Sequence, residues 1–539
     1  MPAAGAVAAA QAAADFKIDR PSPWPRFEHA VYLLIAASPL SKPATNIALA
    51  VCAVLFVRDW LAGRLRPRAT PLDTAVLAWV GANLLSAVTS IDPLGSFRDL
   101  RSIGHWGTYY FVAWAVAYGA PLRLLQNVWL AAGGLTAAVA FVQGALHADP
   151  LGRDIEVPTG FFGGHLELGH YMVVLFALAL ARWNDARETH ERQLAFTAML
   201  AFGGALVISG SRGPWLALLA VICCWGAIVR RGARFILVLA LLLAIQSTFL
   251  VLRGEGPGAF YRSYWMIEKN EPTPVADSQI ASNAWRVAMW REGLRFFALR
   301  PVTGTGVETT RSLSQDFRTP FPDLAVAHLH SNYFEILMTR GFLGLASFFL
   351  LLFVALQRLG QPFGRADSGS ARAALFVGLA AVVTHLVHGL THFTVGSSWI
   401  QIGFYIGLGL GVGQLLRLDD AEGTLDPTIV AAGLVTIAST IVVTPWLAGH
   451  PSLAAALALV ALVDCGARFA TGRYDPLDAA LVAAIGFVAV SSFSLLVLTP
   501  QTQALGVRVL TAAAAPFALT CGAHRIWDLL HSRAESRNS

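Results

Sequence analysis

The sequence is short of charge. Only 13% of its 539 residues are Asp, Glu, Lys or Arg, whereas a soluble domain carries about 25%. Hydrophobic residues make up 55% of the chain, and its mean hydropathy is +0.58. Apolar runs that are long enough, or nearly so, to cross hydrocarbon recur from Val31 to Leu519. This shortage excludes an ordinary soluble domain.

The sequence also lacks the ten-residue segments of alternating hydrophobicity from which transmembrane β-barrels are built. A backbone in lipid has to satisfy its own hydrogen bonds, and a helix does so within one segment. We therefore expect an all-α, polytopic helical membrane protein of the multi-span type.

Cysteine is scarce, and the five that occur show no spacing typical of a metal site or a disulfide framework. The net charge of +6 does not indicate nucleic-acid binding, because the Arg residues lie mostly in short loops between apolar runs, where they set membrane orientation. The Ala-rich residues 1–15 have no positive charge before their apolar stretch, so we expect a tail there and not a cleaved signal.

The apolar runs predict about 14–16 transmembrane helices and one long polar segment between the ninth and the tenth. The first and the fourteenth runs are short. The sixteen runs lie near residues 28–40, 44–60, 72–90, 104–119, 125–147, 166–182, 194–209, 214–229, 235–252, 332–357, 373–393, 399–416, 428–447, 452–465, 478–498 and 505–522.

Basic residues give the predicted helices an orientation. Arg residues cluster after the second, sixth, eighth and tenth runs. The positive-inside rule therefore predicts that both termini are cytoplasmic and that the long segment faces outside, into the periplasm of a Gram-negative cell. The expected parts are a cytoplasmic tail (1–27), helices one to nine (28–252), the periplasmic loop (253–331), helices ten to twelve (332–416), and additional helices with a tail (417–539).

The periplasmic loop contains an amphipathic pattern. Residues 282–301, SNAWRVAMWREGLRFFALRP, place apolar side chains among four Arg residues, which predicts a helix lying at the membrane surface. Ser282 or Asn283 would cap this helix, and Pro301 would end it. The GTGVE stretch at 304–308 predicts a tight turn.

Two histidines, His328 and His330, stand just before the tenth apolar run. We expect Asn332 to cap the helix and Glu335 to complete a capping box. His330 would then lie at a helix N-terminus, where the dipole favours an anion and keeps the ring neutral. The simpler alternative is that both histidines are interfacial polar groups without a role.

Two arginines are candidates for binding an anion. Arg212 lies in a very short external turn, ISGSRGPW, between two apolar runs, and an ionisable residue at membrane depth is a functional hypothesis. Its alternative is an Arg that anchors the turn by reaching to the interface. Arg286 lies on the amphipathic segment and could clamp phosphate oxygens in bidentate fashion, or it could bind lipid headgroups.

These motifs resemble the O-antigen ligase and polymerase superfamily of bacterial envelope enzymes. The family pattern is His, then Asn, Ser or Gln, nine residues, Gly, two residues, and Gly, Thr or Tyr. His330, Ser331, Gly341 and Gly344 match it in full. SGSRGPW resembles the family's Ser-Arg-Gly turn. Residues 285–306 resemble the segment before the family's large periplasmic loop ends, and PTGFFGGHLELGHYM resembles the Gly-rich start of an earlier membrane span. The resemblance covers roughly residues 28–416.

The resemblance implies a metal-independent, inverting glycosyltransferase without a cofactor. Such enzymes pass a glycan from undecaprenyl diphosphate to an acceptor hydroxyl at the periplasmic face of the inner membrane, and ligases use lipid A–core oligosaccharide as acceptor. By this resemblance His330 is the catalytic histidine, acting as base or orienting group, and Arg212 and Arg286 bind the pyrophosphate. Besides donor and acceptor, only membrane lipids are expected as partners.

Other polar residues could support such a site. His165 and His170, with Glu167 between them, could line the cavity or pack helices, and His328 would be at most a helper. Arg98 and Arg101 could add positive charge or anchor their helix. Residues His385, His388 and His392 share one helical face. We expect there a polar stripe and not a zinc site, because no carboxylate lies nearby in sequence to support the imidazoles.

Three further functions stay open. A polysaccharide polymerase would share the donor chemistry, and a protein O-oligosaccharyltransferase would use a Ser or Thr acceptor. A transporter or flippase is disfavoured, because transporters carry internal repeats and mid-span charges, whereas here the ionisable groups gather at one face.

Overall fold

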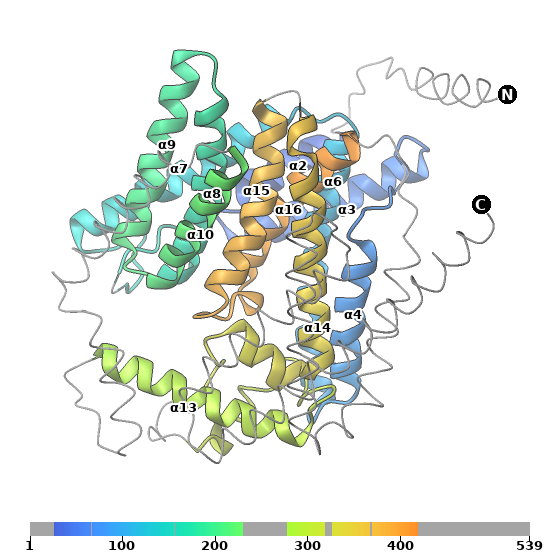
Figure 1. The fold of residues 1–539 in the computed structure, drawn as a ribbon, viewed down its shortest axis with the longest axis vertical. Coiled ribbons are helices and arrows are strands. Elements are labelled where there is room, and N and C mark those ends of the chain that lie inside the picture. Colours follow the sequence, from blue (N-terminus) through green and yellow to red (C-terminus); the bar gives the residue numbers. More distant parts are fainter. Residues whose placement is uncertain are drawn as a thin grey trace, which may run out of the picture.

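The computed structural model describes residues 26–65, 67–155, 157–229, 278–318, 326–366 and 369–418, and these form helices and no strand. Figure 1 shows their arrangement. The α-helices are α2 (Phe27–Ala37), α3 (Lys42–Leu61), α4 (Asp73–Val88), α5 (Pro93–Asp99), α6 (Trp106–Ala117), α7 (Leu122–Leu146), α8 (His165–Asp185), α9 (Thr189–Ile208), α10 (Arg212–Val229), α13 (Ser278–Leu299), α14 (Asn332–Gly360), α15 (Gly369–His388) and α16 (Ser398–Leu418). Short 3₁₀ turns are η1 (Leu100–His105), η2 (Ser314–Asp316), η3 (Gln361–Arg365) and η4 (Thr394–Gly396).

The predicted all-α membrane fold is confirmed. Every predicted apolar run within the described residues coincides with a helix, and seven of those helices are long and apolar enough to cross a membrane. They are α3, α7, α8, α9, α14, α15 and α16, while α2, α4 and α10 are shorter apolar helices. The runs near 235–252 and beyond residue 418 lie outside the described residues.

Several helices present apolar side chains outward, as helices in lipid do. Ile47 and Val54 of α3 are 65% and 67% exposed, and Leu200 of α9 is 62% exposed. Such a surface would be unfavourable in water but is ordinary against hydrocarbon. The outer faces of α3 and α9 are therefore suited to contact with lipid.

α16 lies at the centre of the described bundle and packs against α15, α6 and α8. Its sequence, GFYIGLGLGVG, places glycines on opposite faces. A Cβ on Gly411 would meet the backbone of Ala374 and Gly378 in α15 at 3.2 Å, and one on Gly409 would lie 2.8 Å from the Tyr109 carbonyl oxygen in α6. Small residues thus let three helices approach at backbone contact, as is common in membranes.

The tenth predicted span is not one continuous helix. α14 is broken at Gly341, whose φ is 65° and ψ is −164°, a conformation that is essentially restricted to glycine. In an unbroken helix Phe342 N–H would donate to Met338 O, and Leu343 N–H to Thr339 O. The break leaves these four groups without their helical partners.

The loop at 301–306 supplies the missing partners. Phe342 N–H donates to Pro301 O at 2.8 Å and Leu343 N–H to Val302 O at 3.2 Å, while Thr305 N–H and Gly306 N–H donate to Met338 O and Thr339 O, both at 2.9 Å. All four backbone groups are satisfied inside protein, which permits a broken helix at membrane depth. The predicted turn at 304–308 is present, with positive φ at Gly304, Gly306 and Glu308. It packs against the break in α14 and bonds to it through Thr305 and Gly306.

The segment expected to be an amphipathic helix forms the helix α13, which runs across one end of the bundle (Figure 1). It begins at Ser278, before the caps expected at Ser282 or Asn283, and it ends at Leu299. Its apolar face is covered by protein: Met289 and Phe296 form a cluster with Phe317, Leu329 and Met338. The cluster therefore fixes α13 to the start of α14.

Candidate functional site

The candidate site lies where α13 crosses the bundle, at the N-terminal ends of α8, α10 and α14. Side-chain and backbone contacts join these ends. The Ser211 hydroxyl donates to His165 O at 3.1 Å, and Asn332 N–H donates to Gly389 O at 2.8 Å. Three regions that are far apart in sequence, those around residues 165, 212 and 330, are thus brought to one end of the molecule.

His330 has a strained backbone with φ at 50°, a left-handed conformation that is uncommon for residues other than glycine. The predicted capping box is wrong: Ser331 is the N-cap, and no side chain bonds the cap. Asn332 instead reaches across to the η4 turn, where its Oδ1 accepts from Thr394 N–H at 2.7 Å and from Val395 N–H at 3.1 Å. Tertiary contacts outcompete local capping here, because Asn332 is fully buried.

The rings of His328 and His330 lie side by side, with centroids 4.2 Å apart. His330 N–H donates to His328 Nδ1 at 3.2 Å, so neutral His328 carries its proton on Nε2. The pKa of His330 is lowered to about 3, first by burial and then by the nearby His328 and Arg286. This direction agrees with the expected neutral ring, and its causes are burial and the neighbouring groups.

Arg286 lies near this histidine, and Arg212 lies near Arg286, each on a different element. Arg212 begins α10 after Gly210, whose φ is 65°. The pKa of Arg286 on α13 is lowered by burial and then by the charge of Arg212, so the two guanidinium groups lie close together. Arg286 Nε and His330 Nδ1 are buried and have no hydrogen-bond partner in the described structure. Buried polar atoms normally have a partner, so both atoms are available to a bound molecule, with Arg286 Nε–H as a donor.

A row of buried histidines continues from His330 into the bundle. The ring centroids of His328 and His392 are 5.8 Å apart, and those of His392 and His388 are 5.2 Å apart. His388 and His170 share a hydrogen bond of 2.9 Å between their Nδ1 atoms. The predicted polar stripe thus faces the interior, although α15 ends at His388 and His392 lies in the following turn.

The row packs directly beneath the Arg212 turn. A Cβ on Gly213 would lie 2.7 Å from Cδ2 of His388 and would overlap the Thr391 hydroxyl. Within the described residues no group of three or more His, Cys, Asp or Glu side chains could hold a metal ion. The hydrogen bond between His170 and His388 joins α8 to α15 under the turn.

The remaining candidates lie around this centre. His165 is the first residue of α8 and is half-buried. Glu167 accepts hydrogen bonds from the Ser397 hydroxyl at 2.5 Å and from Gly163 N–H at 3.2 Å, so its carboxylate ties α8 to the start of α16. The backbones of Arg98 and Arg101 belong to α5 and η1, and their side chains lie outside the described structure.

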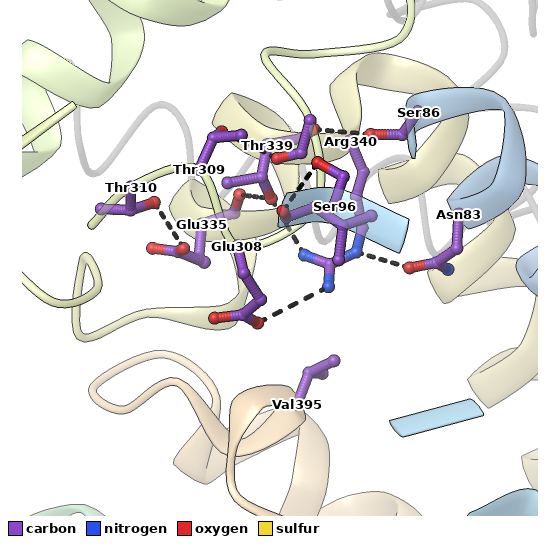
Figure 2. Close-up of polar contacts among 12 residues, drawn as sticks. Asn83, Ser86, Ser96, Glu308, Thr309, Thr310, Glu335, Thr339, Arg340 and Val395 are labelled. Atoms are coloured by element: carbon purple, nitrogen blue, oxygen red, sulfur yellow. Dashed lines mark hydrogen bonds and ion pairs between the residues drawn. The ribbon is translucent and has the colours of Figure 1, made fainter. Parts of the chain in front are cut away.

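Sequence reasoning missed one buried polar network, which Figure 2 shows. Arg340, 3% exposed, donates from Nε to Asn83 Oδ1 of α4 at 2.7 Å and lies 3.9 Å from Glu308 Oε1. The network connects α4, the 301–310 loop and α14 around the helix break. The sequence did contain a signal for this network, namely an arginine inside a predicted span. A charged residue in a span is energetically costly in lipid and therefore faces the bundle interior, where it has partners.

Two comparisons show what this chain is similar to. Residues 197–349 match the family model described as O-antigen ligase, and this range holds Arg212, Arg286, His330 and Gly341. The chain is also similar to an O-antigen ligase of Pseudomonas aeruginosa, with 27% identity over 330 residues, which cover 59% of this chain and 73% of that protein.

Proposed function

We propose that this chain, a member of the O-antigen ligase family, moves an O-antigen glycan from undecaprenyl diphosphate to a hydroxyl of lipid A–core oligosaccharide. The family indicates a membrane glycosyltransferase of the ligase type that acts on a glycan donor and an acceptor.

One observation carries the proposal. Arg212, Arg286 and His330 come from three separate elements and meet at one end of the bundle, where His330 is neutral and a ring nitrogen and a guanidinium nitrogen lack partners. Two adjacent cations repel each other unless an anion lies between them. A bound pyrophosphate would offset the charges of both arginines, and its polyprenyl tail would lie beside apolar helices.

The chemistry follows from these groups. His330 accepts the proton of the acceptor hydroxyl, or orients that hydroxyl, while the oxygen attacks the anomeric carbon of the donor sugar. The new C–O bond forms as the bond between the anomeric carbon and the diphosphate oxygen breaks, which inverts the anomeric centre. The bonding electrons leave with undecaprenyl diphosphate, whose growing negative charge Arg212 and Arg286 stabilise.

We place the site on the periplasmic face of the inner membrane, with both termini in the cytoplasm, and treat residues 253–331 as the periplasmic loop. The positive-inside distribution of arginines supports this placement. Residues 417–539 would form additional helices outside the described structure.

The test is a lipopolysaccharide gel from a deletion strain together with the undecaprenyl-linked pool. We expect the O-antigen ladder to disappear while long glycan accumulates on undecaprenyl diphosphate. Loss of long chains from both carrier and core would instead indicate a polymerase. An unchanged gel would contradict the ligase proposal and direct the search to a protein acceptor.

A further inference from the structure

We infer that Glu335 is a positioning residue, which fixes the backbone before His330 and thereby aims its imidazole. The inference rests on the proposed role of His330 and adds to it a residue outside the family pattern. Glu335 is 0% exposed, and a buried carboxylate is costly unless its oxygens are hydrogen-bonded.

Both oxygens of Glu335 have partners. Oε1 accepts from the Thr310 hydroxyl at 2.6 Å, a contact visible in Figure 2, and Oε2 accepts from Leu329 N–H at 2.7 Å. A helix-capping glutamate would instead bond the N–H of the cap residue, Ser331. Glu335 thus reaches past the helix start and holds the residue immediately before His330.

Leu329 is held on every side. Its carbonyl oxygen accepts from Trp290 Nε1–H of α13 at 2.7 Å, and its side chain is fully buried in the cluster with Met289 and Phe296. The indole of Trp290 is itself stacked on Phe334, with ring centroids 4.9 Å apart. The N–H, the C=O and the side chain of Leu329 therefore all have fixed partners.

On the other side of His330, Asn332 is fixed to Gly389, Thr394 and Val395. His330 is thus joined to two immobilised segments, and between them it keeps its left-handed φ of 50°. Such a conformation persists only where the surrounding structure over-determines it. Removing the Glu335 contact would free Leu329 N–H, and the backbone of His330 could relax.

The experiment measures glycan transfer by the full-length protein in detergent, using a lipid-linked glycan donor and lipid A–core acceptor. We expect Glu335→Ala to lower kcat by about 100-fold, because a misplacement of about 1 Å costs that much, while KM for the donor changes less than about threefold. Amide hydrogen exchange in a peptide spanning residues 327–333 should become faster in the same variant.

Two variants separate positioning from charge and from folding. Glu335→Gln keeps an acceptor for Leu329 N–H and a donor for Thr310, so it should retain kcat within about fivefold. Trp290→Phe removes the other bond to Leu329 but keeps an aromatic ring against Phe334, and should lower kcat about tenfold. Ser347→Ala, which removes a buried hydroxyl that donates to Gly344 O, is the matched control and should leave kcat and exchange near wild type.

Several results would overturn the inference. One is a wild-type kcat in Glu335→Ala, and another is a kcat in Glu335→Gln that is as low as in Glu335→Ala. A third is amide hydrogen exchange at residues 327–333 that stays unchanged although transfer activity is lost. If Glu335→Ala fails to fold, an unchanged kcat in Trp290→Phe would also overturn the inference. Full transfer by His330→Ala would instead refute the proposed function, while the predicted exchange changes could still be observed.

Discussion

Replacing Gly341 by alanine should separate the 301–306 loop from α14. Gly341 has a φ of 65° and a ψ of −164°, which any residue with a Cβ adopts only under strain. The added Cβ would lie 2.6 Å from Gly304 N and would overlap the Val302 carbonyl. These neighbours are backbone atoms, so no side chain can rotate away to make room.

The magnitude can be estimated from two contributions. A non-glycine residue in so rare a conformation costs about 1–3 kcal/mol, and overpacking against fixed atoms costs about 1–3 kcal/mol more. We expect Gly341→Ala to destabilise the protein by about 2–6 kcal/mol. Relief of this strain would break the bonds from Phe342 and Leu343 to the loop, and so move α13 and Arg286 away from His330.

The assay is thermal unfolding of the purified protein in detergent, followed with glycan transfer. Gly360→Ala is the matched control, because Gly360 ends the same helix and a Cβ there meets nothing within 4 Å. Gly341→Ala should lower Tm by several degrees and impair transfer, whereas Gly360→Ala should change neither. If Gly341→Ala and Gly360→Ala have the same Tm and the same transfer activity, the reasoning that Gly341 is required for the helix break is refuted.

Three further predictions concern the candidate site. His330→Ala should lower kcat by about 10²–10⁴-fold while donor binding, measured with labelled lipid-linked glycan, stays intact; normal turnover would exclude His330 from the chemistry. Arg212→Lys should cost about 10–100-fold in transfer, because Lys keeps the charge but loses the planar fork; full activity in that variant would mean that charge alone suffices. Burial lowers the pKa of His330 to about 3 from its usual 6.5, so the unfolded chain binds the proton first and stability falls as pH drops from about 6.5 towards 3. Tm should therefore fall over this range less steeply in His330→Gln than in wild type, and equal slopes would contradict the assigned pKa.

Hydrophobic runs alone predicted the helices well, because a segment in lipid has few alternatives to an α-helix. The predicted span near 166–182 became α8, and that near 399–416 became α16. Local rules failed where tertiary contacts replaced them. Asn332 and Glu335 have the residue types and spacing of a capping box, yet both side chains bond to other segments.

The sequence by itself determined the helical membrane fold, the amphipathic segment that became α13, and the family motifs that point to His330, Arg212 and Arg286. Only the tertiary structure decided that α14 breaks at Gly341, that the 301–306 loop fills the break, and that the buried histidines line up beneath Arg212. The physical reason is the distance along the chain between the residues that interact. Periodicity and hydropathy act within one segment, whereas the partners of a broken backbone or a buried side chain come from segments far away in sequence.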